Sequence, residues 1–205
     1  ERLQFRFGGQ QAESDANSAF FLFAFIVGIF LMSILLMVQL NSFYQVFIIV
    51  SAVILSTAGV QLGLLVTQQI SSALFTSLGV IALAGIVVNN NIVLVDTYNV
   101  ISKENPNLSR DQIVIRTAAQ RLRPIILTTA TTVIGLLPLA SGIGVDFYQR
   151  NIELGGRVSE WWQPMSFAVV CGLTFASAIT LFLTPCWLML PVSIRNTFSN
   201  LKNTF

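Results

Sequence analysis

The chain has 205 residues, of which 54% are hydrophobic and 10% are charged, and its formal net charge is +2 without any histidine. About a quarter of the residues of a soluble domain are charged, whereas no Lys, Arg, Asp or Glu occurs here between Ala16 and Val95. The composition therefore indicates a membrane protein, and it argues against nucleic-acid binding, a histidine metal site and a histidine general base.

The chain begins with a polar segment, 1–17, before its first apolar run. Within it, Leu3–Phe7 alternates like the last strand of a preceding domain, and Gly8-Gly9 ends the pattern. Because the chain starts at Glu1 without a signal peptide, we interpret it as a piece of a larger protein.

Five apolar runs follow, each long enough to cross a bilayer as a helix. Asn41-Ser42 allows only a tight turn between the first two runs, so these should form an antiparallel hairpin. We predict an all-α membrane protein, a five-span helix bundle with polar segments at 99–120, 142–163 and 191–205. The predicted spans are 18–40, 43–66, 73–98, 121–141 and 164–190.

Local signals refine these boundaries. Ser109, followed three residues later by Gln112, fits a capping box, so we predict a short surface helix that ends near Gln120. Pro124 would then lie in the first turn of the fourth span, where proline is tolerated. Pro185 should kink or end the fifth span.

Basic residues favour one side of the membrane. With five spans, the two ends of the chain lie on opposite sides, and the side with 99–120 and 191–205 is the more basic one. Its basic residues are Lys103, Arg110, Arg116, Arg121, Arg123, Arg195 and Lys202. By the positive-inside rule this side should be cytoplasmic, so 1–17 and 142–163 should be periplasmic. Trp161-Trp162 in the outer loop is typical of a membrane interface.

Polar residues interrupt the third and fourth spans. Amides within a bilayer are unfavourable unless they face protein or water, yet Asn89–Asn91 lie in the third span. Asp96 lies seven residues after the first of them, so the two share a helix face. Arg121, Thr128 and Thr132 share a face of the fourth span in the same way. We expect these two polar stripes to pack against each other.

Two interpretations of the stripes remain open. In one, the asparagines and threonines only hold helices together, and Asp96 and Arg121 are hydrated or anchoring groups near the cytoplasm. In the other, they form a transport site, in which Asp96 is the nearest anion on this chain to Arg121 and a possible ion-pair partner. Gly79 and Gly85 are predicted to be close-packing positions.

Enzymatic chemistry has no support in the sequence. It contains no nucleophile–base pair, no phosphate-binding glycine loop and no metal-ligand cluster. Cys171 and Cys186 fall too far apart along one predicted helix to bond each other. We therefore expect a non-enzyme without a cofactor or a metal.

Two motifs occur together in the third and fourth spans. The first is GIVVNNNIVLVD at 85–96, and the second is RLRPIILTT at 121–129, which is followed by GLLPL at 135–139. Together they resemble the resistance–nodulation–cell division (RND) efflux pumps of the acriflavine-resistance type. The resemblance covers essentially the whole chain.

This resemblance implies a twelve-span transporter fold, of which the present spans would be the eighth to twelfth, in the C-terminal half. The N-terminal half typically carries two aspartates where this chain has Asn89 and Asn90. The C-terminal half of the best-known pumps has a lysine in place of Asn89, so the chain departs from them there. Arg121 and Thr128 match the arginine and threonine that rearrange when the aspartates take up protons.

The predicted function is that of the transmembrane coupling part of a proton-driven transporter that exports drugs or other amphiphiles. Its predicted relay residues are Asn89, Asn90, Asn91, Arg121 and Thr128. The resemblance implies the bacterial inner membrane and a homotrimer, with lipids, protons, the missing N-terminal half, its periplasmic domains, a periplasmic adaptor and an outer-membrane channel as partners. The alternatives are an inactive split or truncated fragment with a structural role, and export of another substrate class such as lipid or protein.

Overall fold

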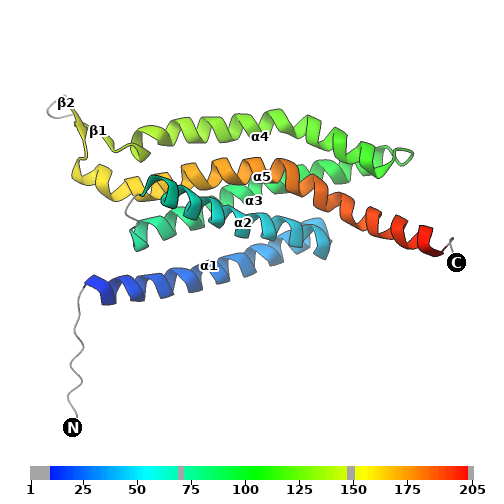
Figure 1. The fold of residues 1–205 in the computed structure, drawn as a ribbon, viewed down its shortest axis with the longest axis horizontal. Helices are drawn as coiled ribbons and strands as arrows, with labels where there is room; N and C mark the ends of the chain where they lie inside the picture. Colours follow the sequence, from blue (N-terminus) through cyan, green and yellow to red (C-terminus); the bar gives the residue numbers. More distant parts are fainter. Residues whose placement is uncertain (1–9, 69–71, 147–150, 203–205) are drawn as a thin grey trace, which may run out of the picture.

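The computed structural model describes residues 10–68, 72–146 and 151–202, so the predicted strand at Leu3–Phe7 lies outside the described residues. Within these ranges, five helices are long and apolar enough to cross a membrane (Figure 1), which confirms the predicted all-α membrane bundle. The helices are α1 Gln10–Leu40, α2 Phe43–Thr67, α3 Ala73–Glu104, α4 Arg110–Ala140 and α5 Arg157–Lys202, and the strands are β1 Ile143–Asp146 and β2 Asn151–Leu154.

The predicted boundary between a surface helix and the fourth span is wrong, because α4 runs without a break through Pro124 and Pro138. The capping box is confirmed: the Ser109 hydroxyl accepts from the Gln112 N–H at 3.4 Å, and the Gln112 side-chain oxygen accepts from the Ser109 N–H at 3.4 Å. The residues before Pro124 are mostly strong helix formers, and a proline in a membrane helix is tolerated when its surroundings satisfy the freed carbonyl. One helix therefore includes the expected surface segment and the span.

α5 is longer than the predicted fifth span at both ends. It begins at Arg157, within the expected loop 142–163, and it continues past Pro185 to Lys202. Pro185 therefore does not end the helix, and most of the expected tail at 191–205 is helical. The tertiary contacts of α5 with three other helices outweigh the loss of single backbone hydrogen bonds at its prolines.

The first part of the expected loop 142–163 contains a β-hairpin that the sequence did not predict. β1 pairs with β2 in antiparallel fashion, with Ile143 opposite Leu154. Gly142 and Gly155 have φ angles of +76° and +85°, which glycine adopts without steric penalty. The Gly155 N–H donates to the Gly142 carbonyl at 3.0 Å and so closes the base of the hairpin.

α5 is the centre of the bundle. It packs against α2, α3 and α4, whereas α1 packs against α2 and α3 within the described part of the chain. The main core is built around α2, α3 and α5, and its fully buried side chains include Ile49, Val60, Leu83, Val95, Ala168 and Leu173. Figure 1 shows α1 and α4 on opposite sides of the other three helices. Most of the apolar surface of α1 and α4 is therefore exposed in this chain.

The two glycines that the sequence predicts as close-packing positions behave differently. A Cβ atom added to Gly79 would lie 2.8 Å from the Met165 carbonyl oxygen and 2.9 Å from the Ala168 Cβ, so α3 and α5 are in backbone contact there. A Cβ atom added to Gly85 would meet nothing within 4 Å. The prediction is confirmed for Gly79 and wrong for Gly85.

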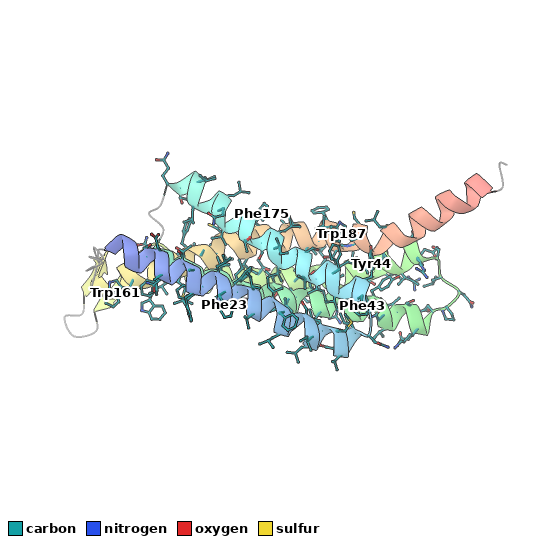
Figure 2. The ribbon with its side chains drawn as sticks, turned by 90° about the horizontal axis from the view of Figure 1, so that it is seen from below. Phe23, Phe43, Tyr44, Trp161, Phe175 and Trp187 are labelled. Atoms are coloured by element: carbon teal, nitrogen blue, oxygen red, sulfur yellow. The ribbon has the colours of Figure 1, made fainter. Side chains whose placement is uncertain are left out.

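Aromatic side chains lie near both ends of the bundle (Figure 2). At the hairpin end, the Trp161 and Phe75 ring centroids are 6.3 Å apart. Toward the other end, Trp187 stacks on Phe47 with a centroid distance of 5.4 Å, and the Tyr44 hydroxyl donates to the Trp187 carbonyl. Aromatic residues at both ends are typical of the two interfaces of a membrane-spanning bundle.

Candidate functional site

The three asparagines do not form one cluster, because consecutive residues on a helix point about 100° apart. Asn91 is 0% exposed, Asn90 is half-buried and Asn89 is exposed. Only the last asparagine of the run thus reaches the core of the described structure.

Asn91 joins α3 to α5. Its side-chain N–H donates to the Val87 carbonyl at 2.9 Å, and its side-chain oxygen accepts from the Thr184 hydroxyl at 3.0 Å. Both side chains are buried. Since a buried amide in a membrane protein needs partners within the protein, this bond accounts for the presence of a polar residue at Asn91.

Thr184 belongs to a buried polar stripe on α5 that sequence reasoning missed. Ser177, Thr180 and Thr184 are three and four residues apart, so they lie on one helix face, and all three are buried. The Ser177 and Thr129 hydroxyls share a hydrogen bond of 2.7 Å between α5 and α4. The stripe therefore bonds α4 at one level and α3 at another, and the i, i+3, i+7 spacing of hydroxyls in an apolar run was its sequence signal.

Arg121 is half-buried and reaches from α4 to α3. Its Nε donates to the Thr97 hydroxyl, and that hydroxyl donates to the Val93 carbonyl at 2.7 Å. A guanidinium has five N–H donors. Within the described part of the chain, the bond from Nε is the hydrogen bond that Arg121 makes, so its terminal nitrogens remain available to a group from elsewhere.

Asp96, the predicted partner of Arg121, is exposed on α3, and Arg121 bonds the adjacent Thr97 instead. The two neighbours differ by about 100° in direction on the helix. The face of α3 that meets α4 is the face of Thr97, so the carboxylate of Asp96 points elsewhere. Sequence spacing did not reveal this, because it does not specify how α3 is rotated against α4.

The remaining predicted residues lie on surfaces that this chain does not cover. We define the open face of α3 by its exposed residues Ile81, Gly85, Asn89, Asp96 and Val100. On α4, Thr128 is also exposed, and its hydroxyl donates to the Ile125 carbonyl of its own helix at 3.0 Å. The sequence predicted that the polar stripes of the third and fourth spans pack against each other. Among the described residues, the bond between Arg121 and Thr97 is what remains of that contact.

A second pair that the sequence did not reveal joins α2 to α3. The Gln45 side-chain N–H donates to the Asn99 side-chain oxygen at 2.7 Å, and the Asn99 N–H donates back to Gln45 at 3.1 Å. The two residues are 54 positions apart in the sequence, so their spacing did not reveal the pair. The pair helps to hold the Arg121-bearing end of the bundle together.

We expect the bond between Asn91 and Thr184 to contribute about 0.6 kcal/mol, which is the average for hydrogen bonds between membrane helices. A double-mutant cycle with Asn91→Ala and Thr184→Val, measured by unfolding in mixed micelles, will give this coupling energy. Thr180→Val is the matched control, because the Thr180 hydroxyl bonds the Ala176 carbonyl of its own helix. If the coupling energy between Asn91 and Thr184 were no larger than that between Asn91 and Thr180, the interhelical hydrogen bond would be contradicted.

Comparison with known proteins decides the family. Residues 1–191 match the AcrB/AcrD/AcrF family. The chain belongs to this family. It is similar to the multidrug resistance protein MdtC of Citrobacter koseri and of Klebsiella pneumoniae, with 32% identity over 148 residues, which is 71% of this chain and 13% of each relative. The chain thus spans 13% of the length of these relatives.

The AcrB/AcrD/AcrF assignment agrees with a solved structure. The chain is similar to a heavy metal efflux pump in an X-ray crystal structure, with 29% identity and a TM-score of 0.63 over 79% of this chain and 15% of that chain. The resemblance to RND efflux pumps is therefore confirmed, and α1–α5 form a multi-pass membrane bundle of an RND transporter.

Proposed function

We propose that this chain is the transmembrane coupling part of a proton-driven efflux transporter of the bacterial inner membrane. Membership of the AcrB/AcrD/AcrF family supports the class of transporter. The observation that carries the coupling role is Arg121, a half-buried cation that is anchored on Thr97 through one nitrogen. The guanidinium lies between two helices near the boundary of the hydrocarbon, and an arginine that faces the interior of a membrane bundle is typical of a path for ions or protons.

In this proposal, Arg121 responds to carboxylates that another part of the transporter brings next to its terminal nitrogens. An ionised carboxylate attracts the guanidinium, and protonation removes most of that attraction. Thr97 fixes the base of the side chain, so the change acts on the contact between α3 and α4. Asn89 lies on the open face of α3, but an amide does not titrate near neutral pH, and the carboxylate of Asp96 points away from Arg121. In this proposal, the proton-binding group comes from outside this chain.

We infer further that the five helices are the eighth to twelfth spans, in the C-terminal half of a trimeric pump. The amides Asn89 and Asn90, in place of two aspartates, support this half. The MdtC relatives support drugs or other amphiphiles as substrates. A periplasmic adaptor and an outer-membrane channel complete the export path in this proposal.

A chimera tests the proposal. The segment of Citrobacter koseri MdtC that matches this chain is replaced by the corresponding residues of this chain, in a strain whose own copy is deleted. We expect efflux of a fluorescent dye that stops when a protonophore collapses the proton gradient. A chimera that is present in the membrane at the normal level but moves no dye would support the structural-fragment alternative instead.

We expect the connection between α3 and α4 to face the cytoplasm and the hairpin to face the periplasm, because of the positive-inside rule. Single cysteines at Asn107 and Ser141, both exposed, report this in a chain whose Cys171 and Cys186 are replaced by alanine. In intact cells with a permeable outer membrane, an impermeant maleimide should label Ser141→Cys and not Asn107→Cys. The reverse pattern would invert the orientation.

A further inference from the structure

The exposed side of α4 combines apolar and basic side chains near the end that connects to α3. Arg116 and Arg123 are exposed there. They lie seven residues apart, which places them on the same side of the helix and roughly 10 Å apart along it. The exposed apolar side chains of α4 nearest to them are Ile115 (62% exposed), Leu122 (45%), Ile126 (52%) and Leu127 (62%).

The apolar side of the span leads directly into these arginines, because α4 is one helix from end to end. Ile126 and Leu127 lie three and four residues after Arg123, so they are its neighbours on the helix surface. Ile134 continues the same side toward the hairpin and is also exposed. Arg123 is thus next to exposed apolar side chains, which are the side chains that contact lipid acyl chains in a membrane.

Helix length places Arg123 at the boundary of the hydrocarbon. No charged residue occurs between Pro124 and Ala140, a stretch of roughly 25 Å at about 1.5 Å per residue. The hydrocarbon core of a bilayer is about 30 Å thick. Side chains of a helix lean toward its N-terminus, which directs Arg123 out of the hydrocarbon and toward Arg116, at the level of lipid phosphates.

Among the residues whose side chains the structure describes, none forms a hydrogen bond or an ion pair with Arg116 or Arg123. Asp111 is the acid on α4, and it lies five positions before Arg116, which places it on a different side of the helix. The two guanidinium groups are therefore positive charges without a described anionic partner, beside exposed apolar side chains. Guanidinium groups bind phosphate oxygens in a planar, bidentate geometry.

We propose that Arg116 and Arg123, together with Ile126 and Leu127, form a binding site for the headgroup of an anionic phospholipid. The guanidinium groups bind the phosphate oxygens of the headgroup, and the two apolar residues contact the first part of the acyl chains. The charge complementarity and the continuity with the apolar side of α4 favour a lipid over a soluble anion. This inference is independent of the transport role proposed above.

Native mass spectrometry of the purified 205-residue chain, titrated with phosphatidylglycerol or phosphatidylcholine in a neutral detergent, tests the site. We expect phosphatidylglycerol to bind more tightly. Each of Arg116→Gln and Arg123→Gln should weaken its binding by about fivefold, which corresponds to about 1 kcal/mol per basic residue near a lipid surface. The double variant should bind the two lipids nearly equally.

Arg110→Gln is the matched control, because it removes the same charge from an exposed position on another side of α4 and should leave the preference unchanged. Ile126→Ser combined with Leu127→Ser should weaken lipid binding without changing the charge. Inorganic phosphate should not displace the lipid, and displacement would assign the site to free anions instead. Far-UV circular dichroism verifies that each variant is helical. Equal binding of both lipids by the unaltered chain, or an unchanged preference in the double variant, would overturn the proposal.

Discussion

Arg121→Ala should abolish proton-driven dye efflux by the MdtC chimera while leaving its level in the membrane nearly normal. The substitution removes the half-buried cation and its bond to Thr97. In the proposed mechanism, this cation is the group that moves when a carboxylate elsewhere in the transporter is protonated. Initial efflux rates measured after energisation should fall to the rate seen with a protonophore. Immunoblotting of membranes provides the expression level.

Two further variants make this result specific. Arg110→Ala removes an exposed arginine at the start of the same helix and should leave the efflux rate unchanged. Arg121→Lys keeps the charge but has fewer donors and no planar fork, so we expect an intermediate rate. Normal efflux by Arg121→Ala would exclude Arg121 from coupling and would favour the interpretation that the polar residues only hold the helices together.

Gly79→Ala should destabilise the bundle by about 1–3 kcal/mol, the usual penalty for overpacking a tight core. The added Cβ would lie 2.8 Å from the Met165 carbonyl oxygen, and a backbone atom in a helix cannot move aside as a side-chain end can. Equilibrium unfolding of the purified chain in mixed micelles, followed by circular dichroism, measures the free energy of unfolding.

Gly85→Ala is the matched control on the same helix. Its Cβ would meet nothing within 4 Å, so the higher helix propensity of alanine, worth about 1 kcal/mol, should stabilise the chain or leave it unchanged. If both variants lost the same stability, the close contact between α3 and α5 would not explain the loss at Gly79.

Secondary structure was predictable from two kinds of sequence signal: hydropathy summed over a whole span, and a capping motif within one helical turn. Each span shows as an apolar run of bilayer length, and hydropathy adds over many residues, so single polar residues do not hide it. The start of α4 was predictable because Ser109 and Gln112 are neighbours on the first turn. The boundary predicted just before Pro124 was wrong, and Pro185 does not end α5, because tertiary packing carries both helices through positions that an isolated helix would not tolerate.

The candidate site was predictable as a set of residues but not as an arrangement. Arg121 was identified from the sequence, whereas its partner Thr97 was not, since charge favours the neighbouring Asp96 and the sequence does not specify which of the two faces α4. The α5 stripe was missed for a related reason. A hydroxyl in a membrane helix often bonds its own backbone, as that of Thr180 does. The Thr184 hydroxyl instead bonds Asn91 of α3, and only the packed structure brings these two residues together.

Hydropathy and short motifs are properties of the chain alone, so they were sufficient to predict a bundle of five membrane-spanning helices with the motifs of one transporter family. Which side of each helix is covered depends instead on how the helices pack. One rotation of α3 about its axis buries Asn91 and Gly79 and leaves Asn89, Gly85 and Asp96 exposed. That rotation results from the packing of α3 against α2, α4 and α5, and in a helix with apolar residues on every side no periodicity in the sequence specifies it.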